Sequence, residues 1–213
     1  MNDNFDSHSL IDQKIYTKIL NEVNHDQIAS DINLYAKNIE QETPGYGHIS
    51  RGFVQYEDLV LPITPEIKKL ENCILLDFKN FFNKEYRIDD TWAVRLVENQ
   101  SVIAHSHYSN HQIYPEEYYS IAYYPSVPDS SAELIFSAEW CGIMKNTFAV
   151  KPRKGLLVIF NSYITHMTAR HKITEPRLVI SMNLSPVNPK TTPNADWSVY
   201  WDRPIIDNPK LLQ

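Results

Sequence analysis

Three of the eight histidines of this chain lie within seven residues, in the segment HSHYSNH that begins at His105 and ends at His111. The segment follows an apolar run, VIA, that favours an extended backbone. Residues i and i+2 of a strand point to the same face of a sheet, so His105 and His107 are expected to project together. Two adjacent imidazoles can hold a transition metal. His111 has a loop-like context, and we expect it in solvent or near the site rather than on the metal.

Two further residues that could do chemistry lie downstream. His166 follows the apolar run GLLVIF (155–160), and Arg177 begins the segment RLVISMNL (177–184). In an extended backbone, Arg177, Val179, Ser181 and Asn183 share one face, and the apolar residues Leu178, Ile180, Met182 and Leu184 share the other. A lone arginine on the polar face is suited to a bidentate contact with a carboxylate.

The secondary structure that must position these residues is predicted to change from helices in the first part of the chain to strands in the second. Two segments are predicted to be helical: residues 10–41, with apolar side chains at mixed spacings of three to five, and residues 64–86, with spacings of three and four. Thr64 is expected to cap the second helix, and Pro65 suits its first turn. Short runs separated by turn signals then predict a β-sandwich or barrel. These runs are residues 91–99, 118–124, 132–137, 146–150, 155–160, 164–169 and 177–184. We predict one domain, with a helical segment 1–90, a β core 91–185 and an irregular tail 186–213.

Composition restricts the partners and the location. The chain has 213 residues, 43% of them hydrophobic, and a net charge of −6. It has no basic cluster, so no nucleic acid partner is expected. It has no run near the roughly 20 apolar residues that cross a membrane, and its first residues do not resemble a signal peptide. Cys73 and Cys141 form no CxxC pair and are expected to be free thiols, so we predict a cytoplasmic protein. The oligomeric state is not readable.

Together these motifs resemble the non-haem iron(II)- and 2-oxoglutarate-dependent oxygenases, in particular a branch of small bacterial and phage proteins. The most specific part is VKPRKGLLVIFNSYITHMTARHKITEPRLVISMNL (150–184). The segments WAVRLVENQSVIAHSHYS (92–109) and YYSIAYYPSVP (118–128) also fit that branch. The resemblance covers roughly residues 90–185.

The resemblance implies a double-stranded β-helix, a jelly-roll and cupin-like fold, with the helices packed outside. It implies iron(II), 2-oxoglutarate and O2 as cofactors, and hydroxylation of an unidentified small molecule or peptide side chain. In the family, two histidines and usually one carboxylate hold the iron. The implied metal ligands here are His105, His107 and His166. The implied cosubstrate residues are Arg177, for the far carboxylate, and more weakly Ser181, Tyr123 and Tyr124. Neighbouring residues alternate in a strand, so only one of the two tyrosines is expected to point inward.

The departure from the family pattern is the missing carboxylate of the usual HxD or HxE. If His105 is the first ligand, His107 takes the place of the carboxylate and the site has three histidines, which is the arrangement we favour. If His107 is the first ligand, Ser109 falls in that place, and water, a halide or a distant acid completes the site, which would allow halogenation. The distant acids considered are Glu116, Glu117 and Glu133, each expected to be a surface charge.

Two other functions stay open at this point. A three-histidine, cupin-like dioxygenase binds its substrate directly and needs no oxoacid, so Arg177 would have no role in it. The second is a jelly roll that has lost catalysis and serves as a binding or structural module, an alternative that the missing carboxylate keeps open. Asn161, Ser162 and Asn183 could line the pocket, and Trp92 is expected in the core.

Overall fold

A computed structural model of the chain describes residues 6–10, 13–42, 48–51, 54–61, 63–107, 114–140 and 144–188. These residues form two α-helices, α1 (His25–Glu42) and α2 (Pro65–Phe82), and a short 3-10 turn at Pro115–Glu117. Neither described helix is long and apolar enough to cross a lipid bilayer. The described strands are β1 (Asp6–Leu10), β2 (Gln13–Ile19), β3 (His48–Arg51), β4 (Val54–Val60), β5 (Tyr86–Leu96), β6 (Val102–His105), β7 (Tyr119–Ser126), β8 (Leu134–Trp140), β9 (Met144–Val150), β10 (Leu156–Asn161), β11 (Thr165–Thr168) and β12 (Arg177–Pro186).

The strands form two antiparallel sheets that make a double-stranded β-helix, as predicted. The larger sheet has the order β1-β2-β10-β7-β12-β5-β4-β3, and the smaller has the order β6-β11-β8-β9. One apolar cluster fills the space between the sheets. In it, the ring centroids of Phe136 on β8 and Phe160 on β10 are 4.9 Å apart. The alternation predicted for residues 177–184 is present, since Val179 lies in this cluster while Leu178, Ile180 and Met182 lie in a second one.

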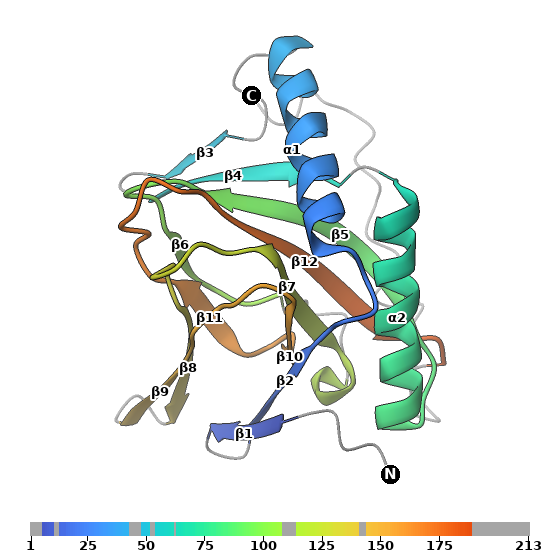
Figure 1. Cartoon of the computed structure of the whole chain (residues 1–213). Helices are drawn as coiled ribbons and strands as arrows, with labels where there is room; N and C mark the ends of the chain where they lie inside the picture. The colour runs from blue at the N-terminus through green and yellow to red at the C-terminus, as the bar shows by residue number, and fades with distance from the viewer. Residues whose placement is uncertain are drawn as a thin grey trace, which may run out of the picture.

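The second cluster lies on the other face of the larger sheet, under the two helices, so the helices pack outside the β-helix as predicted. Figure 1 shows α1 and α2 on one side of the larger sheet and the smaller sheet on the other. Helix α2 buries Ile67, Leu70, Ile74 and Phe78, which have the spacing of one helix face. Thr64 accepts a hydrogen bond from the backbone N–H of Ile67 as an N-cap, and Asn83, in the left-handed conformation (φ 51°), ends the helix.

The predicted helix over residues 10–41 is wrong for its first part. Residues 13–19 form strand β2, which pairs with β10, and α1 begins only at His25. Ile11, Ile15 and Ile19 are spaced by four residues, and a spacing of four fits one face of a strand as well as one face of a helix. Ile15 lies between the two sheets, whereas its neighbour Tyr16 packs on the helix side. Segment 1–90 therefore contributes strands as well as helices, because β4 also pairs with β5.

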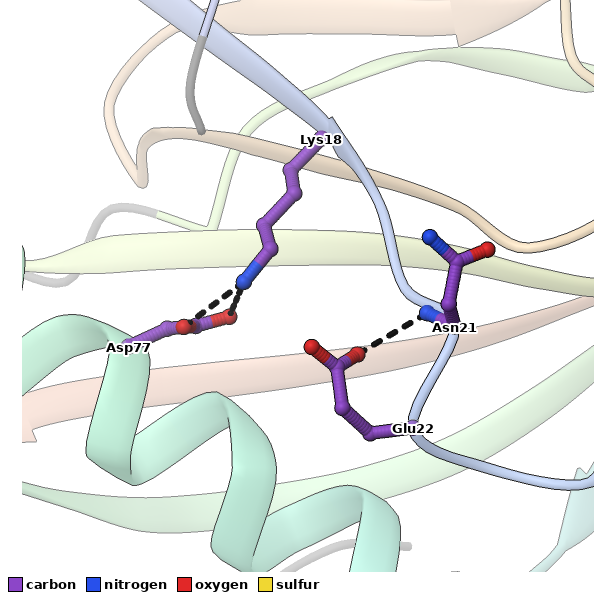
Figure 2. Close-up of polar contacts among 4 residues, drawn as sticks. All are labelled: Lys18, Asn21, Glu22 and Asp77. Atoms are coloured by element: carbon purple, nitrogen blue, oxygen red, sulfur yellow. Dashed lines mark hydrogen bonds and ion pairs between the residues drawn. The ribbon is translucent and has the colours of Figure 1, made fainter. Parts of the chain in front are cut away.

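An ion pair joins the strand that was missed to the second helix. Figure 2 shows Lys18 reaching from β2 to Asp77 on α2, with its ammonium 2.8 Å from both carboxylate oxygens. The two side chains are only 8% and 19% exposed, so water screens this pair poorly. In the turn that follows β2, the backbone N–H of Asn21 donates to Glu22 Oε2 at 2.8 Å. The ion pair thus holds α2 on the outer face of the sheet.

We predict that Asp77→Asn lowers the free energy of unfolding by about 2 kcal/mol, because it removes a carboxylate charge that both oxygens bring to within 2.8 Å of a largely buried ammonium. Urea denaturation monitored by far-UV circular dichroism measures this loss. The matched control is Glu85→Gln, which removes the ion pair between Glu85 and Lys79, whose side chains are 63% and 60% exposed. That control should leave the denaturation midpoint unchanged, and an equal effect of the two substitutions would contradict the role given to Asp77.

Candidate metal centre

Three histidines converge at one end of the space between the sheets. His105 is the last residue of β6 and lies opposite His166 of β11 in the strand register, and His107 follows two residues after His105. The Nε2 atoms of His105 and His107 are 3.1 Å apart, and one nitrogen from each of the three rings lies within 4.8 Å of the others. The structure therefore brings together the three histidines that the sequence predicts as ligands.

The outer nitrogen of each ring faces a hydrogen-bond acceptor. Nδ1 of His105 lies 2.8 Å from the carbonyl of Ile103, and Nδ1 of His166 lies 3.0 Å from the carbonyl of Ile164. Nδ1 of His107 lies 2.6 Å from Oδ1 of Asn183. Because a carbonyl oxygen only accepts, each Nδ1 carries the proton. The Nε2 lone pairs are then free to bind a metal ion.

Burial keeps the imidazoles of His107 and His166 neutral. Desolvation, with a smaller contribution from His105 nearby, lowers the pKa of His166 to about 3. Desolvation also lowers the pKa of His107, although its hydrogen bond to Asn183 acts in the opposite direction. A neutral histidine is the form that binds a metal ion, so these two rings need lose no proton to do so at neutral pH.

The triad opens into a cavity of about 400 Å³ between the two sheets. Its apolar wall includes Val94, Val102, Leu134, Phe160 and Val179, and its polar wall includes Thr168, Ser181 and Asn183. Among the described residues that line it, Arg177 is the one with a full charge at neutral pH. The cavity thus combines a metal-binding group with a single fixed cation.

Arg177 is almost completely buried, at 1% exposure, and its guanidinium is only partly paired. Nη2 donates to the hydroxyl of Tyr124 at 3.0 Å, and Cζ lies 5.0 Å from the centre of the Tyr124 ring. Nε and Nη1 are buried and have no hydrogen-bond partner among the described residues. A buried cation with unpaired donors costs free energy unless an anion binds it, so the geometry fits a carboxylate of a ligand in the cavity.

The two tyrosines proposed for the cosubstrate lie on opposite faces of β7. Tyr124 lines the cavity beside Arg177. Tyr123 lies in the cluster under the helices, where its hydroxyl is 2.5 Å from Nδ1 of His25. The prediction of a cosubstrate contact is therefore wrong for Tyr123, because neighbouring side chains alternate across the sheet. Ser181 lines the cavity, on the same face of β12 as Arg177.

No carboxylate joins the histidine cluster among the described residues. Glu116 and Glu133 are exposed, as expected, whereas Glu117 is buried and forms an ion pair of 2.8 Å with Lys84, so its prediction as a surface charge is wrong. Ser109 and His111 lie outside the described residues. Of the two predicted arrangements, the described residues assemble the one with three histidines.

Sequence reasoning missed two residues of the site. Trp92 was predicted in the core and packs against the apolar cluster between the sheets, but it is only half-buried and also lines the cavity, with its ring centroid 5.4 Å from that of His107. The alternation of TWAVRLV places Trp92 on the face of Val94 and Leu96, and this signal could have found it. Ser120, which is fully buried and 2.9 Å from Oδ1 of Asn183, had no recognisable signal in the sequence.

We predict that His166→Ala removes stoichiometric binding of a divalent transition metal, because the remaining rings cannot close a three-nitrogen site. Anaerobic titration with Co(II) or Fe(II) measures the loss. His25→Gln is the matched control, since His25 is a histidine on the opposite face of the larger sheet. Retention of full-affinity metal binding by His166→Ala would exclude His166 from the coordination sphere.

The comparisons with known proteins rest on structure, since no family model and no curated protein matches the chain. The non-haem alpha-ketoglutarate-dependent carbocyclase SnoK of nogalamycin biosynthesis superimposes with a TM-score of 0.60 at 10% identity, over 88% of this chain and 86% of SnoK. HygX from Streptomyces hygroscopicus, solved with nickel and 2-oxoglutarate, gives 0.56 at 12% identity, over 80% and 83%. A prolyl-4-hydroxylase from Pseudomonas putida gives 0.50 at 10% identity, over 80% and 91%. The chain therefore has the fold of the iron- and 2-oxoglutarate-dependent oxygenases.

Proposed function

We propose that this protein is an iron(II)- and 2-oxoglutarate-dependent oxygenase. One observation carries the proposal: a buried arginine with two unpaired guanidinium nitrogens shares a cavity with three convergent histidine nitrogens. The histidines are suited to a transition metal and the arginine to a carboxylate, and 2-oxoglutarate is a ligand that engages both. The fold shared with HygX, which was solved with nickel and 2-oxoglutarate, supports the same assignment.

The residues present fit these cofactors. Nε2 of His105, His107 and His166 would hold iron(II) on one side and leave its other positions to ligands. Nε and Nη1 of Arg177 would bind the far carboxylate of 2-oxoglutarate, while Nη2 remains on Tyr124. Ser181, on the same face of β12, is a further hydrogen-bond donor within the cavity.

When bound, iron and 2-oxoglutarate supply oxygen activation, in which the oxoacid is converted to succinate and CO2 while O2 oxidises the substrate. The protein's own residues orient these groups and keep water away from them. The apolar wall of Val94, Leu134 and Phe160 lowers the local polarity, which strengthens the pairing of Arg177 with a carboxylate.

Hydroxylation is the reaction we propose within this class, on a small molecule or a peptide side chain. The cavity of about 400 Å³ is large enough for the oxoacid and a small substrate group together. A prolyl-4-hydroxylase is among the proteins that share the fold. A reducing, cytoplasmic location is proposed from composition and is consistent with the free thiol of Cys73.

A cupin-like dioxygenase that uses no oxoacid is the second candidate, and the three neutral histidine ligands favour it. In that enzyme the substrate would bind the metal directly, and Arg177 would have no oxoacid to bind. The requirement for 2-oxoglutarate separates the two candidates.

The experiment that tests the proposal incubates the iron-loaded protein with 2-oxoglutarate, O2 and ascorbate and measures succinate. Succinate that forms only with both iron and 2-oxoglutarate present, and not with His166→Ala, is the expected result. Iron-dependent oxygen uptake without consumption of 2-oxoglutarate would favour the cupin-like enzyme instead. Iron binding without any oxygen uptake would favour a binding module.

We predict that Arg177→Gln raises the dissociation constant for 2-oxoglutarate by about 100-fold, because it removes a charge-assisted, bidentate contact. The affinity for iron should not change, since Arg177 is no metal ligand. Equilibrium dialysis of 2-oxoglutarate against the anaerobic iron-loaded protein measures the effect. The matched control is Arg87→Gln, an exposed arginine paired with Asp89, and unchanged oxoacid affinity in Arg177→Gln would refute the role of Arg177.

We predict that His107→Asp still binds iron, because a carboxylate in this place completes the common set of two histidines and one acid. Anaerobic iron titration should give an affinity within roughly tenfold of the wild type. If His107 were instead the first ligand and Ser109 stood in the place of the acid, the same substitution would abolish iron binding.

A further inference from the structure

The three histidines obtain their outer hydrogen bonds in two different ways. His105 and His166 each lie near the backbone carbonyl two residues earlier, Ile103 and Ile164, within their own segment. His107 lies beyond the end of β6, and the nearest acceptor for its Nδ1 is Oδ1 of Asn183 on β12, at 2.6 Å, with Oγ of Ser120 farther away at 3.2 Å. Its backbone N–H donates to the carbonyl of Ser162 at 2.8 Å. The orientation of the third ring thus depends on a side chain that is far from it in the sequence.

A buried hydrogen-bond network surrounds the Asn183 amide where it faces His107. Oδ1 of Asn183 lies 2.6 Å from Nδ1 of His107 and 2.9 Å from Oγ of Ser120. Oγ of Ser120 also lies 3.0 Å from Oγ of Ser162, and the two serines are 0% and 2% exposed. The Ser120 hydroxyl can donate its one proton to Oγ of Ser162 or to Oδ1 of Asn183, and in the second case Oδ1 accepts from both Ser120 and His107.

The orientation of this amide selects the tautomer of His107. With Oδ1 toward the ring, the proton of His107 is on Nδ1 and the lone pair on Nε2 faces the other histidines. With the amide NH2 toward the ring, Nδ1 would have to accept, and Nε2 would carry the proton and could not bind a metal ion. A carboxylate ligand has no tautomers. The third metal ligand therefore needs a particular tautomer only because a histidine, His107, occupies the place of the carboxylate.

We propose that Asn183, held by Ser120, is a positioning residue that makes His107 a metal ligand by accepting its Nδ1 proton. The inference rests on the proposed function, in which the three histidines bind iron. It explains how this site can use a neutral imidazole in the place of the usual carboxylate. Asn183 lies on the same face of β12 as Arg177 and Ser181, so one strand serves both the cosubstrate and the third metal ligand.

The test compares Asn183→Leu, which keeps the approximate size and removes the acceptor, with Asn183→Asp, which keeps an acceptor. Long-range ¹H–¹⁵N correlation spectra of the metal-free protein at neutral pH report the tautomer of His107. We expect the Nδ1–H form in the wild type and in Asn183→Asp, and a mixture or the Nε2–H form in Asn183→Leu. Anaerobic iron titration should show a dissociation constant roughly 10- to 100-fold higher for Asn183→Leu, with Asn183→Asp close to the wild type.

The matched control is Ser185→Ala, which removes a buried hydroxyl on the same strand that donates to Asp89 at 2.9 Å. It should change neither the tautomer nor the iron affinity. If Asn183→Leu does not fold, Ser120→Ala provides the second test, because loss of its hydroxyl frees the amide to rotate. Ser120→Ala should then show a mixed tautomer and weaker iron binding.

An Nδ1–H tautomer and wild-type iron affinity in Asn183→Leu, or in Ser120→Ala if the first variant is unfolded, would overturn the inference. A wild-type protein that binds no iron would instead refute the proposed function, and the tautomer of His107 would still decide whether Asn183 positions the ring. The two failures are therefore distinguishable.

Discussion

Strand β12 lies at the centre of the larger sheet, paired with β5 on one side and β7 on the other. Its two faces have different tasks. Arg177, Ser181 and Asn183 point into the cavity, while Leu178, Ile180, Met182 and Leu184 form part of the core under the helices. A shift of one residue in register would exchange these faces, placing a guanidinium among apolar side chains and removing the acceptor of His107. The apolar face that holds α1 and α2 therefore also fixes the chemistry of the cavity.

The electrostatics of the cavity follow from the same alternation. Arg177 is buried beside Tyr124, whose hydroxyl and ring face satisfy only part of the guanidinium. No carboxylate joins the three histidines among the described residues, so a bound divalent cation and Arg177 would together attract a dianion. A ligand with a chelating end and a carboxylate at the other end compensates both charges, which makes binding of the metal and of the oxoacid mutually dependent.

How far the sequence predicts this structure depends on whether a pattern has one physical meaning. The strict alternation in RLVISMNL predicted both faces of β12, and the spacing of Ile67, Leu70, Ile74 and Phe78 predicted the buried face of α2. Isoleucines spaced by four around residues 11–19 fit a helix and a strand equally, and pairing with β10 decided for the strand. Local spacing could not reveal that Ser120 and Asn183, 63 residues apart, meet at His107. That contact depends on the pairing of β7 with β12.

Alternation also explains the outcome for the tyrosine pair. The sequence indicated that only one of Tyr123 and Tyr124 would face the cavity, but it could not set the register of β7. In the structure Leu157 pairs with Tyr123, and the backbone N–H of Gly155, just before β10, donates to the carbonyl of Tyr124 at 2.8 Å. In this register Tyr124 faces Arg177.

The most direct test of the central claim, that the histidines and Arg177 form one binding site, is an anaerobic titration of the metal-free protein in the visible spectrum. Iron(II) is added first and 2-oxoglutarate second. We expect a weak charge-transfer band that appears only when both are present and saturates with one oxoacid per iron. Iron that binds to the histidines without producing this band, at any concentration of 2-oxoglutarate, would contradict the account.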